Sequence, residues 1–174
     1  MGKDKNETLR NAMYVLDEFY KDTAIMIETL RGVLIKEYGY KDASGNPVCR
    51  KGSSSLKEST CWTPLYLSFF VKKDTEYISF AIPLKNYFGN NEPKQEYYIY
   101  GCKFFNVKKL DKLPLLAYHS VESPEEEYKK TPKDNFIAVE MEENFDSGKC
   151  IIKSLWDMKD RQAVADFAKQ IVDL

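Results

Sequence analysis

Two glutamates separated by one residue are the pair of side chains best spaced to do chemistry together. Glu140 and Glu142 fall in an alternating segment typical of a strand, so both side chains are expected on one face of a sheet. Two carboxylates on one face can hold Mg²⁺ or act as a general acid and base. A metal-dependent hydrolase or nuclease is therefore one hypothesis. One nuclease motif requires lysine after Glu-x, and Glu142 stands at that place instead. A strand with one solvent-exposed face therefore explains the pair better.

Other catalytic and metal-binding motifs are not found. His119 is the only histidine, and no glycine elbow exposes a nucleophile beside it. Neither glycine-rich phosphate-binding motif occurs. Cys49, Cys61, Cys102 and Cys150 are widely spaced, without the close pairs that a metal site needs. Because Cys102 and Cys150 lie in apolar runs, we expect structural thiols there, and we predict no catalytic residue, no metal and no cofactor.

Aromatic residues between positions 97 and 105 give a more specific indication of binding. Tyr98, Tyr100 and Phe104 alternate along an expected strand and therefore share one face, whereas Tyr97 belongs to the other. Tyrosine hydroxyls need a partner or water. If no helix covers that face, its rings form a semi-polar surface for a protein or a small ligand. We therefore predict a non-enzymatic binding or regulatory module that uses an aromatic sheet face.

Lysines interleaved with these aromatic residues suggest a third hypothesis, single-stranded nucleic-acid binding. The order Gly101-Cys102-Lys103-Phe104-Phe105 does not match the signature of RNA-recognition domains. The 26 basic and 27 acidic residues leave a net charge of −1, which supplies no basic field for a phosphate backbone. Nucleic acid is therefore not expected as a partner.

The composition and the hydrophobic pattern predict an α+β fold. At 174 residues, 43% of them hydrophobic and 30% charged, the chain fits one globular domain. We expect an antiparallel sheet of about five to six strands, packed by a long N-terminal helix and a C-terminal helix. The expected order is a long helix 6–38, a loop 39–63, a three-stranded meander 64–107, an irregular segment 108–134, a hairpin 135–156 and a helix 158–173 capped by Asp157.

The N-terminal helix carries an unusually wide apolar stripe. With Met13 at heptad position a, Leu9 and Leu16 fall at d, and the g positions are also apolar. Three apolar positions in seven describe a helix laid across a broad surface. A helix of 32 residues is about 48 Å long, whereas the expected strands span about 25 Å. About half of the helix should overshoot the sheet, so we predict a homodimer through Leu9, Met13 and Leu16.

The expected cellular setting follows from two absences in the sequence. The first ten residues lack the apolar core of a signal peptide, and no stretch reaches the ~18 apolar residues of a membrane span. We therefore expect a cytoplasmic protein that has no membrane partner. The sequence does not specify which protein or small molecule it binds.

Overall fold

The computed structural model describes residues 2–43, 48–51, 64–83, 97–108, 137–139 and 145–174. These residues form an α+β fold. Its helical elements are α1 (Gly2–Lys36), a short 3-10 helix η3 (Leu155–Asp157) and α4 (Arg161–Val172). Its strands are β1 (Lys41–Asp42), β2 (Val48–Lys51), β3 (Pro64–Lys73), β4 (Glu76–Pro83), β5 (Tyr98–Phe105), β6 (Ile137–Val139) and β7 (Ser147–Ser154).

The strands of the described residues build one antiparallel sheet in the order β1-β3-β4-β5-β7-β6, with β2 also paired to β3. The predicted meander is confirmed: β3 pairs with β4 from Tyr66–Pro83 to Lys73–Glu76, and β4 pairs with β5. The predicted hairpin of β6 and β7 is also confirmed, with Ile137 opposite Cys150. Strand β7 extends this hairpin to the meander because it pairs along its whole length with β5.

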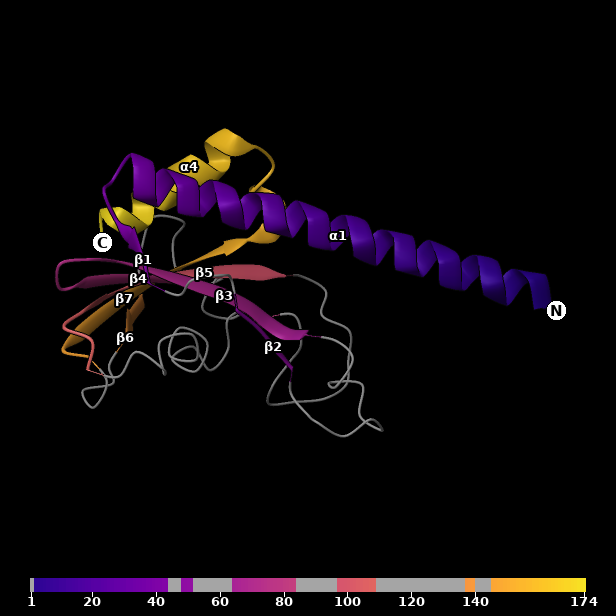
Figure 1. The fold of residues 1–174 in the computed structure, drawn as a ribbon, viewed down its shortest axis with the longest axis horizontal. Helices are drawn as coiled ribbons and strands as arrows, with labels where there is room; N and C mark the ends of the chain where they lie inside the picture. The colour runs from indigo at the N-terminus through magenta and orange to yellow at the C-terminus, as the bar shows by residue number, and fades with distance from the viewer. Residues whose placement is uncertain (1, 44–47, 52–63, 84–96, 109–136, 140–144) are drawn as a thin grey trace.

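Helices α1 and α4 lie side by side on one face of the sheet (Figure 1). The core beneath them joins apolar residues of both helices to those of the strands. The rings of Phe69 and Phe80 stack with centroids 4.7 Å apart, and Phe80 meets Phe167 of α4 edge-on at 6.2 Å. Gly101 lets α4 approach β5 closely, because a Cβ atom there would stand 2.7 Å from Cγ1 of Ile171.

The other face of the sheet carries a second buried cluster. It contains Tyr98, Tyr100, Cys102 and Phe104 of β5, together with Phe145. The alternation predicted for this strand is therefore confirmed, since Ile99 packs in the cluster under the helices. The rings of Phe104 and Phe145 lie 4.7 Å apart, and a Cβ atom on Gly148 would come within 2.7 Å of Phe104.

The structure corrects several predicted boundaries. Asp157 does not cap the C-terminal helix: residues 155–157 form η3, and Asp160 caps α4 by accepting a hydrogen bond from the backbone N–H of Ala163 at 2.9 Å. The sequence Asp146-Ser147-Gly148 is typical of the turn of the predicted hairpin, but Ser147 and Gly148 belong to β7, because β5 continues beside them. Within the segment 39–63, predicted as a loop, residues 41–42 form β1 and residues 48–51 form β2, since both pair with the edge of β3. Helix α1 begins at Gly2, before the expected start.

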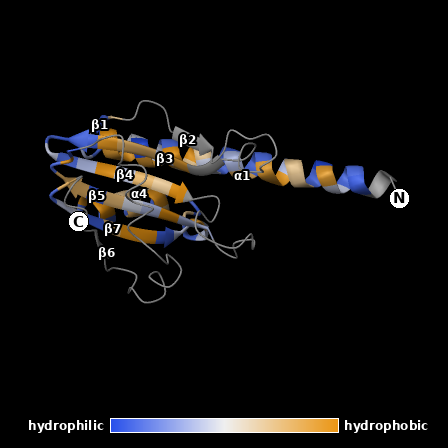
Figure 2. Cartoon of the chain, turned by 90° about the horizontal axis from the view of Figure 1, so that it is seen from below, coloured by the Kyte–Doolittle hydropathy of each residue, from blue (hydrophilic) through white to orange (hydrophobic). Residues whose placement is uncertain are grey.

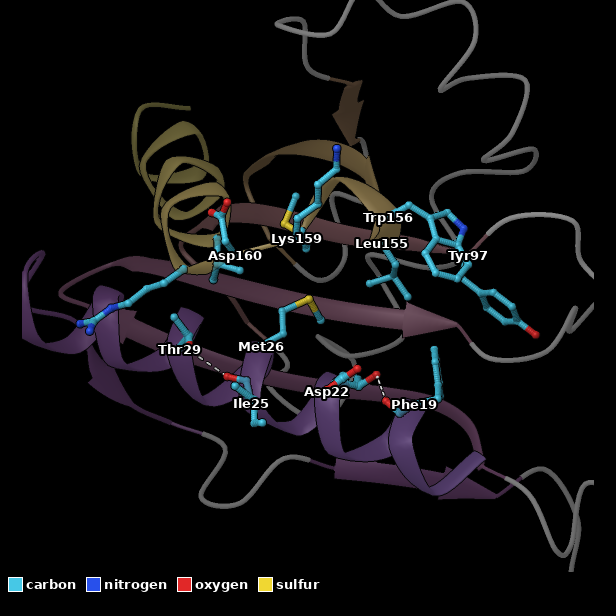
Figure 3. Close-up of a pocket in the computed structure, with 14 residues that line it drawn as sticks. Phe19, Asp22, Ile25, Met26, Thr29, Tyr97, Leu155, Trp156, Lys159 and Asp160 are labelled. Atoms are coloured by element: carbon cyan, nitrogen blue, oxygen red, sulfur yellow. Dashed lines mark hydrogen bonds between the residues drawn. The ribbon is translucent and has the colours of Figure 1, made fainter. Parts of the chain in front are cut away.

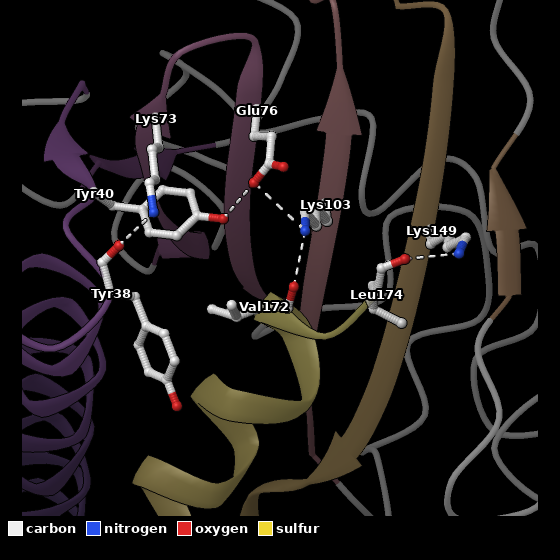
Figure 4. A network of polar contacts seen from close by, with 8 residues as sticks. All are labelled: Tyr38, Tyr40, Lys73, Glu76, Lys103, Lys149, Val172 and Leu174. Carbon is white, nitrogen blue, oxygen red and sulfur yellow. Dashed lines mark hydrogen bonds and ion pairs between the residues drawn. The ribbon is translucent and has the colours of Figure 1, made fainter.

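Two lysines of the sheet, Lys103 and Lys149, hold the end of α4 and the residues after it against the strands (Figure 4). The Nζ atom of Lys103 donates a 2.8 Å hydrogen bond to the carbonyl oxygen of Val172 and lies 3.4 Å from Oε2 of Glu76. The hydroxyl of Tyr40 donates to the same carboxylate oxygen at 2.7 Å. Lysines at the C-terminus of a helix satisfy carbonyl groups that have no partner within the helix. This network is thus a structural anchor of α4.

Candidate functional site

The N-terminal half of α1 extends beyond the rest of the fold (Figures 1 and 2). The side chains of residues 5–17 are all exposed, and from residue 5 onward the first buried residue of α1 is Thr23. We call residues 5–17 the overhang. Its large apolar residues have high exposed fractions: Leu9 62%, Met13 59%, Tyr14 65%, Val15 64% and Leu16 44%. A helix with so many exposed apolar side chains is typical of an interaction surface.

Charged residues of α1 are paired with one another on a different side of the helix. Lys21 lies 2.7 Å from Asp17 and 3.0 Å from Glu18. Hydrogen bonds to Asp17 and then to Glu18 raise the pKa of Lys21 above its usual value. At 100° per residue, Asp17 and Glu18 project more than about 90° away from Ala12. The charges of Asp17, Glu18 and Lys21 are therefore paired within the helix, whereas the large apolar side chains of the overhang are exposed.

A groove opens where α1 leaves the sheet (Figure 3). It has a volume of about 480 Å³ and lies between α1 and the segment from η3 to the start of α4. We call it the α1–η3 groove. Its apolar lining includes Phe19 and Met26 of α1, Tyr97 before β5, and Leu155 and Trp156 of η3. Trp156 is 69% exposed, so its indole presents a large apolar surface beside the groove. This volume is within the range of ligand pockets in proteins.

Local hydrogen bonds fix the walls of the groove. The N–H of Leu155 donates to the carbonyl oxygen of Tyr97 at 2.9 Å, which attaches η3 to the start of β5. The hydroxyl of Ser154 accepts from the N–H of Trp156 at 3.3 Å. On the opposite wall, the ring of Phe19 lies 5.9 Å from that of Tyr97. The groove is therefore formed by backbone-anchored elements.

The rim of the groove carries charges of both signs. Asp22 lies on the α1 side, whereas Lys159, Asp160 and Arg161 lie at the start of α4. An apolar lining with a mixed polar rim is the pattern of protein interfaces. It also suits a helix whose apolar side enters the groove while its polar side meets the rim.

The predicted ligand-binding residues and the predicted dimer residues have opposite environments. Tyr98, Tyr100 and Phe104 are buried in the second cluster, so they do not form an open surface in this structure. Leu9, Met13 and Leu16 are exposed on the overhang, as the comparison of helix and strand lengths predicts. Exposure leaves the predicted dimer untested, but it provides the apolar surface that the prediction requires.

The residues of the catalytic hypotheses cannot be placed. Glu140, Glu142 and His119 lie outside the described residues, as does Cys61. Cys102 and Cys150 are free, buried thiols opposite each other on β5 and β7, and burial raises the pKa of Cys102. Among the described residues, no group of three or more His, Cys, Asp and Glu side chains lies close enough to share a metal ion.

The residues that line the groove are not predicted as a site by the sequence. Phe19 and Met26 fall at the apolar g positions of the N-terminal helix, which predict a broad packing surface and not a groove, and Trp156 is the last residue of the predicted hairpin 135–156. A usable signal is the sequence Leu155-Trp156-Asp157-Met158, in which large apolar residues stand between a strand and a helix cap. Whether this segment lies beside α1 depends on how α4 packs. The sequence of residues 155–158 does not specify that packing.

Comparison of the chain with protein-family models, with curated proteins and with solved structures gave no match. In the part of the chain that the structure describes, none of the helices has the length and apolar character needed to cross a membrane.

Proposed function

We propose that this protein is a binding module that docks a helix of a protein partner on the apolar side of α1. The docking face consists of Leu9, Ala12, Val15 and Leu16 of the overhang together with Phe19, Met26 and Trp156 of the α1–η3 groove. The observation that carries the proposal is the continuity of these residues. Positions 12, 15, 16, 19 and 26 follow helical spacing, so a single side of α1 runs from the overhang into the groove.

The chemistry of the docking face supports a helical partner. A helix binds to a groove through apolar anchors spaced by three, four and seven residues. Leucine and valine side chains on the overhang and aromatic rings in the groove offer complementary surface to such anchors. Trp156 combines a large apolar area with an indole N–H, a combination enriched at binding hot spots. This proposal moves the binding surface of the predicted module from the aromatic sheet face to α1.

The test uses a hydrocarbon-stapled amphipathic helix of about 16 residues, unrelated in sequence to this chain, as a probe. A Trp62→Phe variant leaves Trp156 as the only tryptophan, so its emission reports on the groove. The titration uses a low concentration of the chain, so that the overhang of another copy does not compete and the docking face stays unsubstituted. We expect a saturable blue shift of the emission as the probe covers the indole.

Two variants test where the probe binds: one inside the docking face, and one outside it as the control. Phe19→Glu, in the same background, should weaken the probe at least tenfold, because a carboxylate would replace a half-buried apolar wall of the groove. Lys169→Glu, on an exposed position of α4 outside the groove, should leave the affinity within about twofold. An emission spectrum that stays unchanged up to millimolar probe would refute a helix-docking function.

A further inference from the structure

We infer that the helix docked in the α1–η3 groove is the overhang of a second copy of this chain. This inference rests on the proposed function and names its partner. In the resulting dimer the two α1 helices run antiparallel, and the overhang of each copy fills the groove of the other. Such an arrangement is a closed two-fold interface, in which the same patch of both copies is buried.

The position of the two features on α1 supports this pairing. The overhang ends at residue 17, and the α1 residues of the groove begin at Phe19 and end at Thr29. A two-fold axis that passes near residues 17–18 therefore places the overhang of each copy on the groove of the other. It sets Leu16 opposite Phe19 of the other copy and Leu9 opposite its Met26. The two segments also match in length, since the overhang spans about 20 Å and the groove segment about 16 Å at 1.5 Å per residue.

The charges of α1 are compatible with an axis at this place. Asp17 and Glu18, which stand next to the axis in sequence, project away from the docking face and pair with Lys21. The residues nearest to the axis on the docking face are Val15, Leu16 and Phe19, which are all apolar. Two copies can therefore approach without bringing like charges together at the centre of the interface.

The available area is sufficient for a stable dimer. Half of the lateral surface of a helix about 20 Å long and about 11 Å wide is about 350 Å². Each copy buries that area on its overhang and a similar area on its groove, which gives about 700 Å² per copy. Specific interfaces bury about 800 Å² per partner. A single contact between one overhang and one groove would reach only half of this value, so the symmetric arrangement is favoured.

The decisive pair of variants places a charge on opposite sides of the overhang. Leu16→Glu alters the docking face, whereas Tyr14→Glu alters a residue of greater exposure that projects about 200° around the helix from Leu16. By sedimentation equilibrium we expect the unsubstituted chain to be a dimer and Leu16→Glu to dissociate with a Kd at least a hundredfold higher. Tyr14→Glu should stay within about threefold of the unsubstituted chain. Near-ultraviolet circular dichroism, which reports on the packed aromatic rings of the folded body, should be alike in all three proteins.

A peptide of residues 5–20 then tests the occupant directly. Added to the monomeric Leu16→Glu, Trp62→Phe chain, the peptide should shift the Trp156 emission, and a Leu16→Glu version of the peptide should bind at least tenfold more weakly. An unsubstituted chain that is monomeric at high concentration, or equal dissociation of both variants, would overturn the inference. If the unrelated stapled helix binds while the chain's own peptide does not, the docking function stands and the second copy is excluded. If neither binds, both proposals fail.

Discussion

The ring centroids of Phe19 and Tyr97 lie 5.9 Å apart, at the place where α1 leaves the folded body. N-terminal to this contact, the side chains of α1 are exposed, and C-terminal to it the helix becomes part of the core. The contact therefore holds one wall of the α1–η3 groove against the start of β5.

Removing this ring should loosen the end of the folded body. We expect Phe19→Ala to lower the free energy of unfolding by about 1 kcal/mol, because a half-buried aromatic pair is lost. Urea denaturation in the monomeric Leu16→Glu background measures this without a contribution from association. Tyr14→Ala, on an exposed residue, should change the same quantity by less than about 0.5 kcal/mol. Equal effects of the two substitutions would show that the Phe19–Tyr97 contact does not stabilise the fold.

Two glycine-to-alanine substitutions should act in opposite directions. At Gly101 an added Cβ would lie 2.7 Å from Cγ1 of Ile171 and 3.0 Å from Cζ of Phe167, so α4 must shift. We expect Gly101→Ala to cost about 1–3 kcal/mol in the free energy of unfolding. At Gly32 no atom lies within 4 Å of the added Cβ, and alanine favours the helix.

Gly32→Ala should therefore increase the free energy of unfolding by about 0.5–1 kcal/mol. Chemical denaturation of both variants beside the unsubstituted chain decides the outcome. A neutral Gly101→Ala would mean that α4 does not pack on β5 as closely as the structure describes.

The pH dependence of stability should reveal the buried hydroxyl of Tyr40. Burial, followed by its hydrogen bond to Glu76, raises the pKa of Tyr40 well above its usual value of about 10. The folded state therefore keeps this proton at a pH where the unfolded state releases it. The resulting stabilisation is fully present below pH ~10 and is lost as the pH rises above that value.

We expect the free energy of unfolding to fall less steeply between pH 9 and pH 11 in Tyr40→Phe than in the unsubstituted chain. Urea denaturation at several pH values within this range gives the slope for each protein. Identical slopes would show that Tyr40 titrates alike in the folded and unfolded states.

The paired thiols of Cys102 and Cys150 should be unreactive in the native protein. Both side chains are fully buried, and burial with the neighbouring Cys150 raises the pKa of Cys102. Because the thiolate is the species that is alkylated, we expect neither cysteine to react with iodoacetamide at pH 8 until the chain is unfolded. Mass spectrometry of the digested protein measures each site, with the urea-unfolded chain as reference. Rapid alkylation of the native chain would contradict the described burial.

Much of the fold follows from local patterns, and the groove does not. Alternation between Tyr98 and Phe104 predicts which residues share a face, and the length of the helix compared with that of the strands predicts that α1 overshoots the sheet. Whether the face bearing Tyr98 is covered depends on contacts distant in sequence, and the structure buries it. The pairing of β1 with Lys72 and Val71 also could not be predicted, since a strand of two residues is too short to show an alternating hydrophobic pattern. Trp156 joins the site only because Leu155 is hydrogen-bonded to Tyr97.

Amide hydrogen exchange of residues 5–18 measures whether the overhang of one copy occupies the groove of another. An unpacked helical end of this length is marginally stable in water, so its amides should exchange quickly. We predict that their protection increases with protein concentration in the unsubstituted chain and stays low at every concentration in Leu16→Glu. Exchange rates for residues 5–18 that are the same at all concentrations in both proteins would contradict the account.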